Sequence, residues 1–275
     1  MQAVLFTFHK IREQSEQGNA LAWRALLEFY GSTLIRLLEI HAAISPREAF
    51  PVAQKTMAAL AADNFARLRA APRESEREFL GDLRGMLFET ALESGVHGES
   101  AIPGGALQPE TITKLLDGLP LLHKEMLFFK LSGYTDNTIE AIMRLSPRVA
   151  DKAFERLAGE FQAARQNDSD RSPWPTSWVA FLKQARALKS ENCTPAHEMV
   201  RIHDGQVSWY DKEPVEKHVS GCLHCLQAWT GLREVGYWRR VADPLSSSEI
   251  EELLAVIPVE KAPPKKKSFF ARLRS

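Results

Sequence analysis

Three cysteines and one histidine lie close together near the end of this 275-residue chain, and they constrain its fold more than any other feature. The chain has only three cysteines, and all of them fall in the pattern Cys193…His218-x3-Cys222-x2-Cys225. A C-x2-C pair commonly places two thiolates on one ion, and structural Zn²⁺ takes four thiolate or imidazole ligands in a closed tetrahedron. The pattern therefore predicts a structural zinc site formed by Cys193, His218, Cys222 and Cys225.

The spacing of these residues also predicts the local fold. His218 and Cys222 are four residues apart, so on a helix both side chains leave the same face. Cys193 reaches them only if the chain doubles back, and Asp204-Gly205 provides a turn between them. We expect two antiparallel helices joined at one end by the metal.

Other readings of the same residues remain open. His197, His203 and His224 are also close in sequence and could replace a proposed ligand; His197 is the most serious rival to Cys193, and His224 is the least able to reach the metal. Alternatively, the thiols are reduced core residues. A catalytic zinc ion needs an open coordination position, whereas four ligands close the site. Because the chain also lacks a Gly-rich phosphate loop and a G-x-S-x-G motif, we expect neither an enzyme nor a small-molecule substrate.

An odd, sparse cysteine count argues against a disulfide framework and favours the reducing cytoplasm. No signal peptide and no apolar run long enough for a transmembrane segment is evident in the sequence. Lys plus Arg and Asp plus Glu both number 35, so the whole chain has no strong field to attract phosphates. Any contact with nucleic acid must come from a local patch.

Nearly every segment has the apolar period of a helix, which predicts an all-α fold. Apolar residues recur at spacings of three and four over about 21–42, 46–70 and 75–94, and again from Trp178 to Leu188. Between 110 and 162 we expect a short helix near 111–116 and then helices over 120–130, 135–144 and 147–162. Gly133 provides a turn between two of them, and Ser146-Pro147 opens the last. This layout is typical of a helix-turn-helix.

The stretch LLDGLPLLHKEMLFFKLSGYTDNTIEAIMRLSPRVADKAFERLAGEF resembles the fourth, promoter-reading region of extracytoplasmic-function sigma factors. Its Leu119-Pro120, Gly133-Tyr134, Ala141-Ile142 and Leu145-Ser146 fall at the corresponding places of that family's pattern. The stretch LAWRALLEFYGSTLIRLLEIHAAISPREAFPVAQKTMAALA is similar, more weakly, to the family's second region, which binds RNA polymerase. The cysteine-rich segment resembles the zinc-binding anti-sigma domain.

The resemblance implies a bacterial regulator of transcription initiation that binds RNA polymerase core, promoter DNA or both. It also implies that the fused zinc domain modulates this binding. The alternative is a degenerate sigma-like scaffold that binds a regulatory protein partner through the zinc domain and does not bind DNA. The expected organisation is a region-two-like domain (1–96), a linker (97–108), a helix-turn-helix domain (109–165), a second linker (166–176), a zinc-binding domain (177–240) and a disordered basic tail (241–275).

The helix over 147–162 is the expected DNA-reading element. Ser146 precedes it, and Arg148, Lys152 and Arg156 follow at four-residue intervals, so one face could meet DNA. The alternative is a solvated face in which acids and bases form ion pairs along the helix. The end of the tail, near 261–275, is basic and contains Phe269 and Phe270. It is either a hook for phosphate, an acidic partner or an anionic surface, or simply a solubilising tail.

Overall fold

The computed structural model describes residues 7–96, 113, 116–167 and 178–259, and side chains of the third range as far as 158. Within these residues the fold is all-α, with twelve helices and no β-sheet, which confirms the predicted fold class. Most of the expected helix near 111–116, most of the two predicted linkers and the end of the tail lie outside the described residues.

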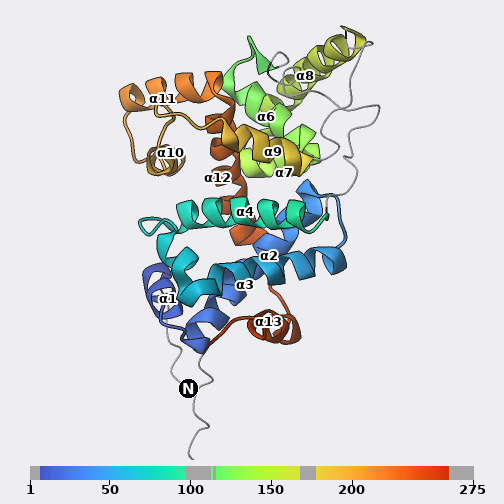
Figure 1. The fold of residues 1–275 in the computed structure, drawn as a ribbon. Helices are drawn as coiled ribbons and strands as arrows, with labels where there is room; N and C mark the ends of the chain where they lie inside the picture. Colours follow the sequence, from blue (N-terminus) through green and yellow to red (C-terminus); the bar gives the residue numbers. More distant parts are fainter. Residues whose placement is uncertain (1–6, 97–112, 114–115, 168–177, 260–275) are drawn as a thin grey trace, which may run out of the picture.

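The N-terminal helices pack together in the lower half of Figure 1. They are α1 (Phe8–Ser15), α2 (Ala20–His41), α3 (Pro46–Ala70) and α4 (Glu76–Glu93). Capping side chains start all four: Thr7 before α1, Asn19 before α2, Ser45 before α3 and Ser75 before α4. Ser45 and Glu48 form a complete capping box.

Helix α3 is not continuous, although its apolar period predicts one helix over 46–70. Asp63, Asn64 and Phe65 all have positive φ angles, which break the helix near its last third. This conformation turns the Phe65 ring toward Trp23, with 5.9 Å between ring centroids. The same ring lies 3.3 Å from the position that a Cβ on Gly18 would occupy, so the turn at Gly18 has room for it. The strained backbone of Asp63, Asn64 and Phe65 therefore lies where the Phe65 ring packs against Trp23 and Gly18.

The upper half of Figure 1 holds the helix-turn-helix and the cysteine-rich part. The first comprises α6 (Leu121–Leu131), α7 (Asp136–Met143) and α8 (Pro147–Asn167). The second comprises α9 (Trp178–Ala187), α10 (Ala196–His203), α11 (Trp209–Gly221) and α12 (Leu223–Val241). Gly133 makes the predicted turn before α7 with a φ of +98°, and α8 runs two residues into the stretch predicted as a linker.

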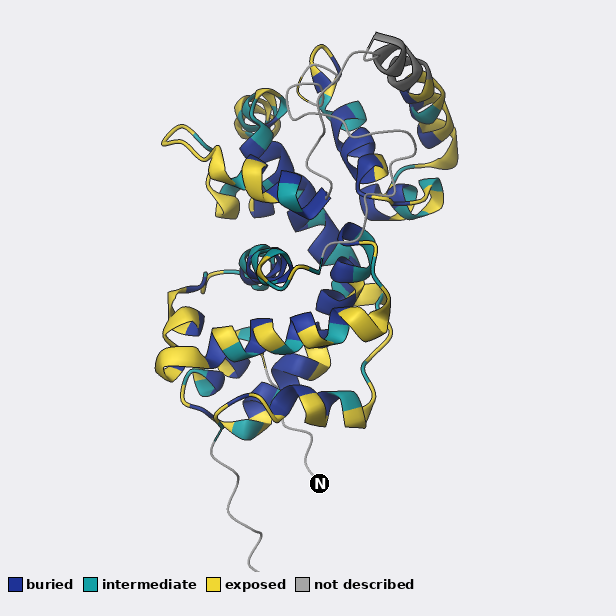
Figure 2. Ribbon diagram, turned by 45° about the vertical axis from the view of Figure 1, so that its right-hand side comes forward, coloured by how far each residue is buried: buried dark blue, intermediate teal, exposed yellow. Residues whose placement is uncertain are grey.

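Helix α12 is the common partner of both halves. It packs against α2 and α4 below and against α6, α7, α9, α10 and α11 above. One continuous apolar core consequently includes residues of all three predicted domains, and Figure 2 shows buried positions along the helices that meet around α12.

The prediction of a disordered tail over 241–275 is wrong for its first part. Residues Ser247–Leu254 form a further helix, α13, which packs on α2 and α3. It begins with a capping box between Ser246 and Glu249, and its Ile250 and Leu253 are buried. The apolar residues that follow the capping box are therefore folded into the core, while 260–275 lie outside the described residues.

Candidate metal centre

The four residues predicted as metal ligands come together in the structure. The ligand atoms of Cys193, His218, Cys222 and Cys225 all lie within 4.8 Å of one another. The sulfurs of Cys193 and Cys222 are 3.8 Å apart, and His218 Nε2 lies 3.2 Å from the Cys225 sulfur. Zn–S bonds of about 2.3 Å in a tetrahedron place two sulfurs about 3.8 Å apart. The cluster could therefore hold a metal ion with four protein ligands.

Three short segments deliver these ligands. Cys193 lies in the loop before α10, His218 is in the last turn of α11, and Cys225 is in the first turn of α12. Gly205, with a φ of +69°, makes the predicted turn that brings the chain back toward Cys193. The doubling back expected from the sequence is thus present.

The expectation that His218 and Cys222 share one helical face is wrong. Cys222 has extended backbone angles (φ −120°, ψ 113°) and lies at the junction where α11 ends and α12 begins. The break gives each helix its own direction, so that His218 and Cys225 approach the centre from two different helices. A continuous helix would place Cys225 almost two turns beyond His218, on a shared axis.

The pKa values of two of the thiols are shifted in opposite directions. Hydrogen bonds favour ionisation of Cys193, and burial opposes ionisation of Cys225. Burial works against ionisation of Cys193, but hydrogen bonds from the Ser190 side chain and backbone and from the other thiols outweigh it and lower its pKa. The Ser190 N–H donates to the Cys193 sulfur over 3.2 Å. Burial raises the pKa of Cys225. A bound cation reverses that effect, because a coordinating thiol is deprotonated.

None of the three rival histidines belongs to the cluster. His197 is exposed and is not among the four clustered groups. His203 packs against Trp229, with ring centroids 4.2 Å apart, and burial lowers its pKa to about 2. His224 Nδ1 lies 2.9 Å from the backbone oxygen of Arg186. Among the described residues, the cluster therefore matches the ligand set predicted from spacing.

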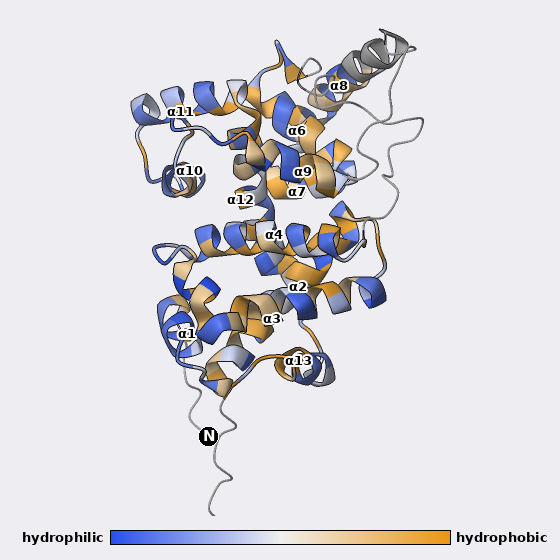
Figure 3. Ribbon diagram, in the orientation of Figure 1, coloured by the Kyte–Doolittle hydropathy of each residue, from blue (hydrophilic) through white to orange (hydrophobic). Residues whose placement is uncertain are grey.

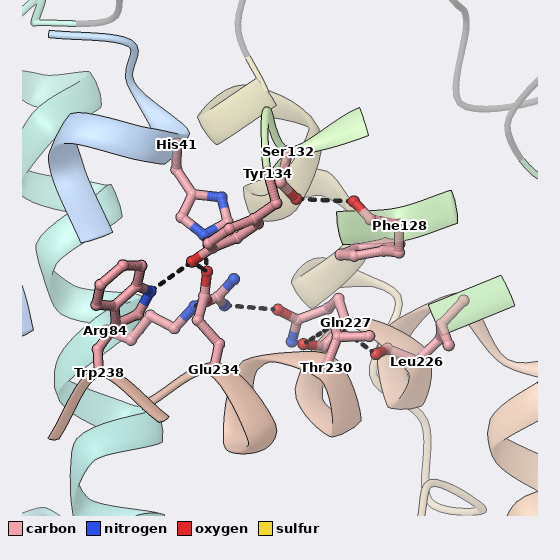
Figure 4. Close-up of polar contacts among 10 residues, drawn as sticks. All are labelled: His41, Arg84, Phe128, Ser132, Tyr134, Leu226, Gln227, Thr230, Glu234 and Trp238. Atoms are coloured by element: carbon pink, nitrogen blue, oxygen red, sulfur yellow. Dashed lines mark hydrogen bonds and ion pairs between the residues drawn. The ribbon is translucent and has the colours of Figure 1, made fainter. Parts of the chain in front are cut away.

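A buried polar cluster fixes α12 to the rest of the molecule, and the sequence analysis did not identify it. Glu234 of α12 is fully buried and meets His41 of α2, Arg84 of α4 and Tyr134 of the turn before α7 (Figure 4). Arg84 Nε lies 2.7 Å from the Glu234 carboxylate, and Trp238 Nε1 donates to the Tyr134 hydroxyl over 2.7 Å. We call these five residues the Glu234 cluster.

The charges of the Glu234 cluster balance in its interior. Burial opposes ionisation of Glu234, but His41 and Arg84 outweigh it and lower the carboxyl pKa to about 2. Burial lowers the pKa of His41, while the charge of Glu234 and the hydrogen bond to its carboxylate act in the opposite direction. Arg84 then supplies the compensating positive charge. The signal in the sequence was a glutamate between apolar residues of one helix. In the structure its neighbours Gly231, Val235 and Trp238 are also buried.

Two further polar contacts tie α6 to the metal-binding part. Lys124 Nζ donates to the backbone oxygen of Ser220 over 2.6 Å, two residues before Cys222. Glu125 is buried and pairs with Arg233 of α12, with 2.6 Å between Oε2 and Nε. Helix α6, the first helix of the predicted helix-turn-helix, is thus anchored directly beside the candidate metal site.

The residues predicted to contact DNA lie on the outside of the molecule. Ser146 precedes α8, and Arg148, Lys152 and Arg156 are exposed along it. The opposite side of α8 is apolar, with Ala150, Ala153 and Leu157 buried. At 3.6 residues per turn, Asp151 and Glu155 occupy the strip beside the basic row, and both are exposed. Among the described side chains of α8, no ion pair joins the two strips.

The fold and the site together define an all-helical protein with a four-ligand Cys3His cluster that could hold a metal ion. Scans against family models, curated proteins and solved structures found no match to this chain. No described helix combines the length and apolar character needed to cross a bilayer.

Proposed function

We propose that this protein is a zinc-binding regulator of transcription initiation that contacts DNA through α8. The observation that carries the proposal is the row of exposed cations at Arg148, Lys152 and Arg156, on a helix whose other side packs on the preceding helix-turn-helix elements. Cationic side chains on the exposed face of such a helix can contact phosphates and base edges when the helix lies in a groove. The resemblance of this segment to the promoter-reading region of sigma factors supports the same function.

Zinc is the metal that we propose for the Cys3His cluster. Three thiolates and one imidazole are soft and borderline donors, and a closed tetrahedron of such ligands is typical of structural zinc. The ion would staple the loop before α10 to the junction of α11 and α12, and we assign it no catalytic step. Because α12 packs on both halves, the zinc-stapled part would set how the helix-turn-helix is presented to DNA.

DNA binding is tested with a labelled random-sequence duplex titrated with the full chain at several salt concentrations. Wild type should bind with an affinity that falls steeply with salt, because cations released from the phosphates drive binding. Arg148→Glu and Lys152→Glu should each weaken binding and lower the salt slope by about one. The matched control is Arg69→Glu, since Arg69 is exposed on α3 in the other half. Equal loss in all three variants, or no binding by wild type, contradicts the proposal.

A second candidate is a scaffold that binds a protein partner and does not bind DNA. The specific observation that favours it is the acidic strip of Asp151 and Glu155, which lies beside the cations and reduces attraction to phosphate. Purifying the tagged full chain from its own cells and measuring its metal content separates the two. Zinc with RNA polymerase subunits supports the regulator, whereas zinc with a different protein and no polymerase supports the scaffold.

A further inference from the structure

The face of α2 and α3 that carries α13 has the features of a helix-binding groove. Four buried residues of the C-terminal segment, Ile250, Leu253, Leu254 and Ile257, follow the i, i+3, i+4, i+7 pattern. This is the pattern by which an amphipathic helix lies in a partner's groove. Figure 3 shows hydrophobic and hydrophilic residues side by side on α13, which lies below α2 and α3.

Shape and charge on the receiving side match this helix. A Cβ on Gly31 of α2 would come within 2.6 Å of Leu245 Cδ1, so the missing side chain makes room for the leucine. Arg24 of α2 forms an ion pair with Glu251, and Gln54 of α3 donates to the backbone oxygen of Glu252 over 3.2 Å. We call this surface, marked by Arg24, Gly31 and Gln54, the α13-binding face.

The attachment of α13 differs from that of α12. Helix α12 is held by the fully buried Glu234 cluster, whereas the Arg24 and Glu251 side chains are 33% and 62% exposed. The connection from α12 is the non-helical stretch 242–246, which contains Pro244. An eight-residue helix is too short to persist alone, so α13 is helical only while it is docked. Its contacts are of a kind that a competing helix can reproduce.

Two apolar side chains near the α13 contacts in sequence are exposed. Leu21 lies one turn before Arg24 on α2 and is 60% exposed, and Val256 is 40% exposed at the end of the docked segment. We propose that the α13-binding face is a docking site for an amphipathic helix of a protein partner, and that α13 is its intramolecular competitor. This proposal is independent of DNA binding by α8.

The test uses the full chain and a fluorescent peptide of residues 244–259. Leu253→Asp in the chain removes a buried contact and should undock α13, whereas Ser248→Asp adds the same residue at an exposed position of the helix. Fluorescence anisotropy should show the peptide binding the Leu253→Asp chain at least tenfold more tightly than wild type or Ser248→Asp. The same peptide carrying Leu253→Asp should not bind. Equal affinity for all chains, or loss of the N-terminal helices in the Leu253→Asp chain, overturns the proposal.

A second form of the experiment leaves every contact residue intact. A specific protease site placed in 242–244 allows cleavage of the folded wild-type chain between α12 and α13. Excess labelled peptide should then replace the cleaved segment, as measured by anisotropy after gel filtration. A segment that stays bound and does not exchange shows a permanent part of the core and overturns the proposal. A dimer that exchanges α13 between copies, seen by light scattering, overturns the intramolecular arrangement.

Discussion

Replacing Glu234 by glutamine tests whether the buried cluster holds α12 through charge. The substitution keeps the shape of the side chain but leaves Arg84, whose side chain is 5% exposed, without its carboxylate. The Glu234 pKa of about 2 lies roughly two units below the ordinary glutamate value, and each unit corresponds to about 1.4 kcal/mol. The expected loss in the free energy of unfolding at pH 7 is therefore about 3 kcal/mol, which agrees with the usual cost of breaking a buried ion pair.

The depressed pKa of Glu234 also predicts how its contribution to stability changes with pH. A carboxyl group whose pKa is depressed by folding stabilises the native state above its unfolded pKa, near 4.3. That stabilisation is lost as the pH falls from there toward about 2. The difference between wild type and Glu234→Gln should therefore be full at pH 7 and shrink steadily below pH 4.

Urea unfolding followed by circular dichroism, at pH 7 and at steps down to pH 3, measures this difference. The matched control is Glu13→Gln, since Glu13 is exposed on α1 and its loss should change stability by less than about 0.5 kcal/mol. Equal stability of Glu234→Gln and wild type at pH 7 would refute the reasoning. A loss that does not shrink in acid would show that Glu234 acts through packing rather than charge.

The remaining predictions concern the metal-binding part. Ser190→Ala removes a side chain 3.5 Å from the Cys193 sulfur and should lower zinc affinity about tenfold, as measured by competition with a chromogenic chelator; unchanged affinity would contradict a role for this contact. Gly205→Ala should destabilise the fold by about 1 kcal/mol in urea unfolding, because its φ of +69° strains any side chain. Gly221→Ala, at the end of α11 with open space around it, should be neutral or stabilising, and an equal loss in both variants would contradict the backbone explanation.

Local rules predict most of the helices and the metal ligands. The apolar period marks α2, α4 and α6, and the Ser45–Glu48 capping box marks the start of α3. The spacing of the cysteines and His218 predicts the four residues of the Cys3His cluster, and the structure separates them from His197, His203 and His224, which the spacing left open. Both kinds of signal are contained in short stretches of chain, so a single sequence carries them.

What the sequence did not predict depends on contacts between distant residues. Phe65 occupies a regular position in its apolar stripe, yet packing against Trp23 accompanies a break in α3 that no local pattern reveals. In the sequence Glu234 cannot be distinguished from the other acidic residues, because its partners His41 and Arg84 are 193 and 150 residues away. Helix α13 did carry a local signal, the capping box of Ser246, but the composition of the residues after it suggested disorder.

The candidate metal site and the Glu234 cluster lie at different parts of α12. The helix begins at Cys222 without a side-chain cap and without acids in its first turn, so no carboxylate complements its positive end. Three thiolates around one dication carry a net negative charge at that end, and a bound metal would therefore take the place of the missing cap. Nine residues on from Cys225, about 14 Å along the axis, Glu234 fixes the same helix against α2, α4 and the Tyr134 turn. A straight helix held at both points would have one position relative to α6, α7 and α8, so with a metal bound the orientation of α8 would depend on the ion and on the buried carboxylate together.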